Sequence, residues 1–441
     1  MKSLDQKIAS IRANPQGAKD FILADAKDAD MATGLAATGK DPVTGRPRSL
    51  AEYRDQMREI VRQGLVDIML MSASTSEVLT MRERLFDNSA VTPAARANDT
   101  TDIHLPAGGT YGAEPSRPFQ STTIDHIQAG KIDPTPQERS RGANLGLYSI
   151  TPNNRIDFDY VTLNAYKEFR LEAERKGFRH FLEVFDPNAC AAACPADLGR
   201  FINDLIVRTL AGVPSTGRPL FLKIPYHGPR AMEELVAYDP TLVPGILGGS
   251  SGTTHDAFKL LEEAKRHGAR AALFGRKINN SEHQLTFVTY LHAIANGKIM
   301  ADEAVKAYHG DLERLKIKPY RSLKADMELT VTATSYAGST AGPKPAATVS
   351  AKPAPSAERP KVKVTMSSTG PSARPAFSRR TAAPAVRPTA GQAAPAADGG
   401  LPKKSDGSPD FSKMSAAQKV AYSMQRIKTD IVRNGNGDGQ R

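Results

Sequence analysis

Two charged side chains inside apolar runs are the first candidates for chemistry. Lys223 lies within residues 220–225 (LFLKIP), and Glu183 lies within residues 180–185 (HFLEVF). A buried ammonium group is costly unless it is paired or deprotonated, and a neutral lysine can attack a carbonyl carbon to form a Schiff base. A buried carboxyl group with a raised pKa can serve as a general acid/base. The structural alternatives are an ordinary ion pair of Lys223 with Glu183 or Asp25, and an outward-facing Glu183 that pairs with a helix.

Two glycine-rich segments follow later apolar runs and are candidates for binding an anion. Glycine lets the backbone approach a ligand closely, exposed N–H groups bind anionic oxygens, and a nearby cation adds charge. The predicted phosphate-binding residues are Gly248, Gly249, Ser250, Gly275, Arg276 and Lys277. Either segment alone is weak evidence, because glycine is common at tight turns. The two together favour a phosphate site.

Further residues that could take part in the site are an aspartate, two histidines and two cysteines. Asp25 ends an apolar run and is a candidate catalytic acid, whereas His227 is either a substrate contact or a packing residue. Cys190 and Cys194 are four residues apart, but a tetrahedral metal site needs two more ligands and no nearby Cys or His supplies them. We therefore predict plain loop cysteines, no metal and no cofactor. His104 is placed on a predicted strand, with its direction open.

The elements that must position these residues follow a regular alternation. Eight short apolar runs, bounded by Gly, Pro or polar clusters, are typical of buried parallel strands. They cover residues 21–25, 66–72, 101–105, 145–150, 180–185, 220–225, 244–249 and 269–275. Helices are predicted between them, at residues 157–177, 195–212 and 253–268 and, weakly, at 122–128 in a long Gly/Pro-rich loop.

Eight strands alternating with helices predict an α/β fold of the (β/α)8 TIM-barrel type, whose function lies at the carboxyl ends of the strands. A doubly wound open sheet is the competing architecture. The absence of a GxGxxG motif after the first strand weakens its dinucleotide-binding form.

The chain composition separates a folded body from a basic tail. The chain has 441 residues and a net charge of +12, of which residues 331–441 carry +11 and residues 1–330 only +1. Residues 341–410 hold 12 of the 31 prolines, so they bury too little apolar surface to offset the entropy of ordering. We predict a barrel domain over residues 1–330, a disordered basic linker over 331–410 and an amphipathic helix over 411–435.

The tail helix is predicted from a capping box formed by Ser415 and Gln418 and from apolar residues at helical spacing. It either docks on its own body or binds a protein or compartment-shell partner. A nucleic-acid partner is not expected, because stacking aromatics are nearly absent from the tail. Two cysteines, no signal peptide and no apolar span of about 20 residues predict a soluble, cytoplasmic protein.

Taken together, these residues resemble the class I (Schiff-base) aldolases of the bacterial and archaeal type, the superfamily of fructose-bisphosphate, tagatose-bisphosphate and deoxyribose-phosphate aldolases. The resemblance covers residues 20–297 and rests on Lys223, on the segment GILGGSSGTTHDAFKLLEEAKRHGARAALFGRKI and on an acid ending the first strand. It implies that Lys223 forms the imine, that Asp25 orients groups or helps with proton transfer, and that the glycine turns hold a phosphate. Such barrels are often homo-oligomers.

The chain also departs from the family pattern. Phe185 stands nearest the position where fructose-bisphosphate aldolases place a tyrosine acid/base, and Glu183 matches the glutamate of tagatose-type members. The resemblance therefore implies a divergent lyase that acts on a phosphorylated keto sugar, with the individual sugar left open. The alternative is an inactive barrel that serves as a scaffold through its tail. Deleting residues 331–441 distinguishes the two, because an enzyme would keep its turnover and a scaffold would lose its partner.

Overall fold

The computed structural model describes residues 1–41, 44–190, 194–249 and 252–330, with single positions between 402 and 418. The chain divides into two compact units, Met1–Ala351 and Lys352–Arg441. In the second unit the backbone N–H of Ser415 donates to Gln418 Oε1 (2.9 Å) and that of Gln418 donates to Ser415 Oγ (3.2 Å). The predicted capping box is therefore present. Nearly all of the predicted linker and helix lies outside the described residues.

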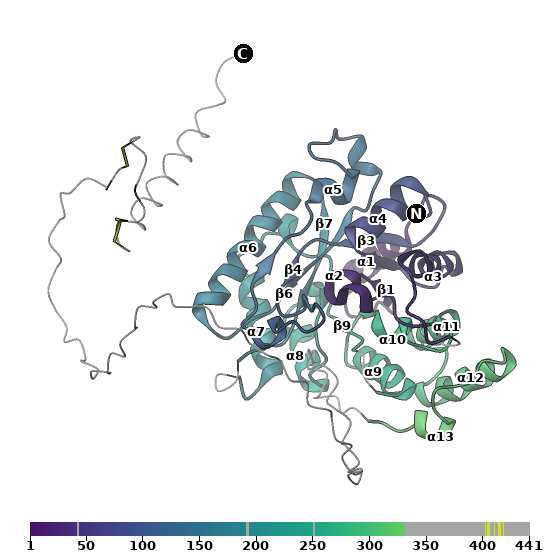
Figure 1. Cartoon of the computed structure of the whole chain (residues 1–441). Coiled ribbons are helices and arrows are strands. Elements are labelled where there is room, and N and C mark those ends of the chain that lie inside the picture. The colour runs from purple at the N-terminus through teal and green to yellow at the C-terminus, as the bar shows by residue number, and fades with distance from the viewer. Residues whose placement is uncertain are drawn as a thin grey trace, which may run out of the picture. The chain divides into compact units, whose positions relative to one another are not determined.

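Eight parallel strands form the centre of the first unit (Figure 1). They are β1 (Ile22–Lys27), β2 (Ile68–Met71), β3 (Thr92–Arg96), β6 (Leu145–Ile150), β7 (Arg179–Val184), β8 (Leu222–Lys223), β9 (Gly245–Leu247) and β10 (Ala271–Phe274). Their order is β8-β7-β6-β3-β2-β1-β10-β9. The two ends meet, because Ile224 bridges Ile246 in parallel and its N–H donates to the Gly245 carbonyl (3.0 Å). The sheet is thus a closed (β/α)8 barrel, as predicted, and not an open sheet.

Helices connect the strands and surround the barrel (Figure 1). They are α1 (Ser3–Ala13), α2 (Asp30–Thr33), α3 (Leu50–Gln63), α4 (Ala73–Ser76), α5 (Ile124–Ala129), α6 (Ile156–Arg175), α7 (Leu198–Leu210), α8 (Pro229–Tyr238), α9 (Thr254–Arg266), α10 (Arg276–Asn279), α11 (Gln284–Ala295), α12 (Ala301–Arg314) and α13 (Leu323–Asp326). The four helices named from sequence are confirmed as α5, α6, α7 and α9. Thr253 caps α9 in a capping box with Asp256. No helix among the described residues is long and apolar enough to cross a membrane.

The third strand differs from the prediction. The barrel strand is Thr92–Arg96 (TPAAR), whereas residues 101–105 form a turn, with the His104 N–H donating to the Thr101 carbonyl (3.3 Å). His104 is therefore on no strand, and its ring packs against Tyr111 and Phe119. Alanine and proline have low strand propensity, so pairing with β2 and β6 on either side, rather than local preference, makes this segment a strand.

Two separate apolar cores reveal which way each strand residue faces. The smaller core takes alternate residues from the strands, such as Ile22, Ala24 and Ala26 of β1, and is joined by Leu4, Ile8 and Ile11 of α1. The larger core takes the intervening residues, such as Leu23, together with the surrounding helices. Because side chains alternate along a strand, the smaller core is the barrel interior, plugged by α1.

Candidate active site

Lys223 and Glu183 face each other inside the barrel at the carboxyl ends of two neighbouring strands. Each lies two residues after an interior phenylalanine, Phe221 and Phe181, so each points inward. The register pairs Glu183 with Lys223 across β7 and β8. Lys223 Nζ lies 2.5 Å from Glu183 Oε1, and the two side chains are 8% and 1% exposed. The ion pair expected as the structural alternative is present, and it places an amine beside a carboxylate at the barrel mouth.

Three further polar residues extend this pair across the barrel. Ser149 of β6 donates from Oγ to Glu183 Oε2 (2.6 Å). Arg96 of β3 places Nη2 3.7 Å from the same Glu183 oxygen and donates from Nε to Asp28 Oδ2 (2.6 Å). Asp28 directly follows β1. The resulting mouth cluster comprises Asp28, Arg96, Ser149, Glu183 and Lys223, all of them buried.

Electrostatics inside the mouth cluster keep Asp28 ionised. Burial alone would raise the pKa of Asp28, but the positive charges of Arg96 and Lys223 and the hydrogen bond from Arg96 outweigh burial and hold the pKa below its usual value. The charge of Lys223 thus reaches Asp28 as well as Glu183. Asp28 is suited to orient polar groups as a carboxylate, not to donate a proton.

Sequence reasoning missed Arg96 and Ser149 and set Asp28 aside as part of a solvated loop. Arg96 ends the strand that was assigned to the wrong segment, so its position at a strand end was hidden. Ser149 lies inside an apolar run, and an isolated serine carries no signal by itself. For Asp28 the available signal was the alternation of side chains along a strand, because Asp28 lies two residues after Ala26, which faces the barrel interior.

Asp25 is not part of the mouth cluster. Asp25 lies two residues after Leu23 and, like Leu23, points out of the barrel. Its side chain is fully buried there, and Oδ2 lies 3.8 Å from Lys27 Nζ. Lys27 donates to Gln284 Oε1 of α11 (2.7 Å), whereas neither Asp25 oxygen accepts a hydrogen bond from the described residues. Burial raises the pKa of Asp25 to about 6 and lowers the pKa of Lys27 to about 8. The structure thus corrects the expected inward position of Asp25, and Asp28 occupies it.

The glycine turns follow β9 and β10, as predicted. A Cβ on Gly248 would lie 2.2 Å from Phe274 Cδ1, and a Cβ on Gly275 would lie 2.3 Å from the Ala26 carbonyl oxygen. Packing alone therefore explains glycine at these two positions. Gly249 has φ +58°, which glycine adopts without strain. Ser250 lies outside the described residues.

Arg276 and Lys277 are adjacent in sequence but belong to different surroundings. Burial lowers the pKa of Arg276, against the attraction of Glu183 and Asp28, so Arg276 is near the mouth cluster. Lys277 instead interacts with Asp326, Arg321, Asp256 and Glu282, outside the barrel. The structure therefore separates the two cations that the sequence grouped in one phosphate site.

The remaining candidates lie in loops at the same end of the barrel. His227 Nε2 is 2.7 Å from Asp186 Oδ1, and both side chains are nearly buried, so the imidazole is held by a carboxylate. Cys190 and Cys194 are joined in a disulfide, which corrects the expectation of plain loop cysteines. Among the described residues, no group of three or more His, Cys, Asp and Glu side chains is placed to hold a metal.

Comparison with known proteins bears on the family. No family model matches the chain. A stretch of 91 residues is 34% identical to 2-amino-3,7-dideoxy-D-threo-hept-6-ulosonate synthase 1 of Archaeoglobus fulgidus, covering 21% of this chain and 34% of the synthase. The match thus spans about a third of the length of that curated relative.

Solved structures agree with the fold. Fructose-bisphosphate aldolase from Slackia heliotrinireducens superposes with a TM-score of 0.51 at 13% identity, over 70% of this chain and 92% of that one. An archaeal fructose 1,6-bisphosphate aldolase gives a TM-score of 0.48 at 14% identity, over 67% and 100%. The chain is thus similar in barrel fold to a bacterial fructose-bisphosphate aldolase and, over 91 residues, similar in sequence to the hept-6-ulosonate synthase.

Proposed function

We propose that the protein is an aldolase-type lyase that makes or breaks a carbon–carbon bond in a phosphorylated keto sugar through a Schiff base on Lys223. The observation that carries the proposal is the inward-facing Lys223–Glu183 pair, with Nζ 2.5 Å from Oε1 at the barrel mouth. Such a pair combines the two groups that imine chemistry requires, a nucleophilic amine and an adjacent proton acceptor.

The first step joins Lys223 to the ketone. Glu183 takes one proton from the ammonium group, and the neutral amine adds to the carbonyl carbon. The adduct oxygen receives one proton from the added nitrogen and one from Glu183, and it leaves as water. One ketone and one ammonium group become one protonated imine and one water. Ser149 and Arg96 hold Glu183 from its other oxygen, so that Oε1 stays directed at Lys223.

The second step breaks the bond between the carbons α and β to the imine carbon. Its electron pair flows to the imine nitrogen and leaves a neutral enamine, while the β-hydroxyl loses its proton and becomes an aldehyde. We assign proton removal to Glu183, whose Oε1 lies 2.5 Å from the nitrogen that becomes the imine and which is a carboxylate again after it has returned its proton. Asp28, held ionised by Arg96, is assigned the orienting role that the sequence suggested for Asp25.

The phosphorylated substrate rests on the same end of the barrel. Gly249 and Gly275 supply backbone N–H groups there, whereas the Gly248 N–H already donates to the Leu273 carbonyl oxygen (2.8 Å). Arg276 supplies a positive charge near Glu183 and Asp28. The local match to a hept-6-ulosonate synthase supports a substrate of the keto-sugar class. His227, oriented by Asp186, is a candidate contact for the sugar hydroxyls.

Borohydride trapping tests this proposal. Incubation with a panel of phosphorylated ketoses and borohydride is expected to add the mass of one reduced substrate, and peptide mapping is expected to place it on Lys223. Lys223→Met should form no adduct, and its turnover should fall at least 1,000-fold, which corresponds to ~4 kcal/mol of activation free energy. The control Lys298→Met changes an exposed lysine and should keep both. Turnover by wild type without an adduct, together with an active Lys223→Met, contradicts the imine mechanism.

A further inference from the structure

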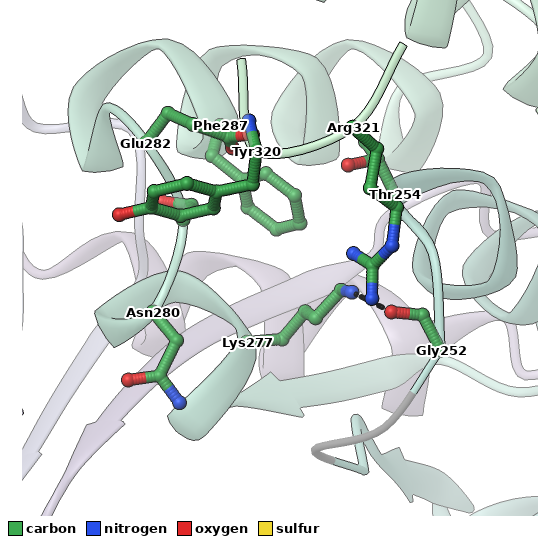
Figure 2. A pocket seen from close by; sticks show the side chains of 9 residues that line it. Gly252, Thr254, Lys277, Asn280, Glu282, Phe287, Tyr320 and Arg321 are labelled. Atoms are coloured by element: carbon green, nitrogen blue, oxygen red, sulfur yellow. Dashed lines mark hydrogen bonds between the residues drawn. The ribbon is translucent and has the colours of Figure 1, made fainter. Parts of the chain in front are cut away.

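A small pocket lies outside the barrel mouth, between α10, the start of α11 and the segment that follows α12 (Figure 2). Its volume is about 210 Å³, below the roughly 300–1,000 Å³ of pockets for drug-sized ligands. The lining residues are Gly252, Thr254, Lys277, Asn280, Ser281, Glu282, Phe287, Tyr320 and Arg321. The size suits a phosphate group with a short carbon chain.

Two cations share one wall of this pocket. Lys277 Nζ donates to the Gly252 carbonyl oxygen (2.7 Å), and the Arg321 guanidinium lies beside it in Figure 2. Burial lowers the pKa of Lys277 to about 8; nearby carboxylates, chiefly Asp326, oppose this, and repulsion from Arg321 adds to it. Among the described residues, neither cation forms an ion pair, although the carboxylates of Asp326, Asp256 and Glu282 are near enough to attract Lys277. Two neighbouring cations that no carboxylate contacts directly favour an anionic ligand at the pocket wall.

The acidic side chains around the pocket are already engaged by other donors. Glu282 accepts from the Tyr308 hydroxyl (3.0 Å) and from the Tyr320 N–H (2.9 Å), one bond to each oxygen. Asp326 accepts from the Thr254 N–H (2.8 Å) and lies 3.0 Å from His309 Nε2. These carboxylates therefore stay turned toward the protein instead of neutralising the two cations.

The position of Arg321 is held by the segment that follows it. The Thr253 hydroxyl donates to the Glu328 carbonyl oxygen (2.7 Å), and Thr330 donates from its hydroxyl to Asp256 (2.6 Å). These bonds tie residues 322–330 to the start of α9. The backbone after Arg321 is thus held in place, whereas the Arg321 residue itself is exposed and reaches the pocket from the solvent side.

The pocket is distinct from the barrel mouth. Arg276 is attracted by Glu183 and Asp28, whereas Lys277 is surrounded by Asp326, Arg321, Asp256 and Glu282. Tyr320 and Arg321 come from beyond the eight barrel strands. Arg276 and Lys277, which are consecutive in α10, therefore lie at two separate sites.

We propose that this pocket binds the phosphate group of a small metabolite at a second site, through Lys277 and Arg321, with Phe287 and Tyr320 as an apolar wall for its carbon chain. The site is separate from the proposed reaction centre. Because Lys277 also donates to the Gly252 carbonyl oxygen, the ligand lies beside Gly252, two residues before α9 begins.

Tungstate, a heavy-atom analogue of phosphate, provides the test. Crystals of the full-length chain soaked in tungstate are expected to show anomalous density within hydrogen-bonding distance of Lys277 Nζ and the Arg321 guanidinium. In calorimetry with inorganic phosphate, Lys277→Met and Arg321→Gln are each expected to weaken binding at this site at least tenfold. Lys277→Arg should retain binding.

Three controls separate this site from the reaction centre. Arg314→Gln removes an exposed arginine of α12 (76% exposed) and should leave phosphate binding unchanged. Arg276→Gln and Lys223→Met alter the mouth and should leave this site intact, whatever they do to turnover. Tungstate density at the mouth alone or at neither place would overturn the proposal, as would phosphate affinity that Lys277→Met and Arg321→Gln change less than threefold.

Discussion

Arg96 offers the sharpest test of the mouth cluster, because two buried carboxylates depend on it. Its guanidinium contacts Asp28 at 2.6 Å and approaches Glu183 at 3.7 Å, with about 6% of its side chain exposed. Arg96→Met keeps a side chain of similar length but removes the charge and all its donors. Lys223 then remains as the partner of Glu183, and Asp28 is left without a partner of its own.

The loss of stability in Arg96→Met comes from the Asp28 carboxylate, which is left without its main counter-charge. Removing one partner of a buried ion pair destabilises a protein by about 3–5 kcal/mol, so we expect a loss of this size at pH 7.5. The loss should shrink at acidic pH. In wild type the pKa of Asp28 is lowered, so its contribution to stability is present above the unfolded pKa of about 4 and is lost only below it.

In Arg96→Met the effect of burial on Asp28 remains and the main attraction is gone, so the pKa of Asp28 rises above its unfolded value. The folded state then binds a proton that the unfolded state does not hold, and the variant regains stability as the pH falls through the raised pKa. Urea unfolding of both proteins at pH 7.5 and pH 5.5 measures this. The ion pair between Arg46 and Glu52 is exposed, and Arg46→Met is the matched control, expected to change little. A loss below about 1 kcal/mol at pH 7.5, or a loss that grows at pH 5.5, would refute the reasoning.

Two further predictions concern positions around the cluster. Asp25→Asn leaves Lys27 buried without a counter-charge, so we expect a loss of about 3–5 kcal/mol at pH 7. A buried lysine with a lowered pKa costs stability only while it is charged, so the loss should be smaller at pH 9.5. Urea unfolding at both pH values measures this, and an equal loss at the two values would contradict the pairing of Asp25 with Lys27. Gly248→Ala places a Cβ 2.2 Å from Phe274 and should lower the free energy of unfolding by about 1–3 kcal/mol. In the control Gly212→Ala the new Cβ meets nothing within 4 Å. Equal melting temperatures for the two variants would contradict the packing argument.

The two key side chains of the candidate site could be identified from sequence because charge inside an apolar run is a local signal. Lys223 and Glu183 stand out among hydrophobic neighbours, and each run has the length of a buried strand. The capped helix α9 was equally readable, since Thr253 and Asp256 form its capping box within four residues. Such features depend on residues that are close together in the chain, so they can be recognised without knowledge of the fold.

Tertiary structure decides which side chains of each strand point into the barrel and which point out of it. The alternation that separates Asp25 from Asp28 is present in the sequence, but both faces of a parallel barrel strand are apolar, so no local pattern says which face is interior. The same holds for Arg96, whose strand forms because β2 and β6 pair with it on either side. Arg276 and Lys277 likewise look equivalent along the chain, and only the short helix α10 turns one toward the mouth and the other toward Arg321. Residue type is a local property, whereas the neighbours that give a charge its role are brought together by barrel closure.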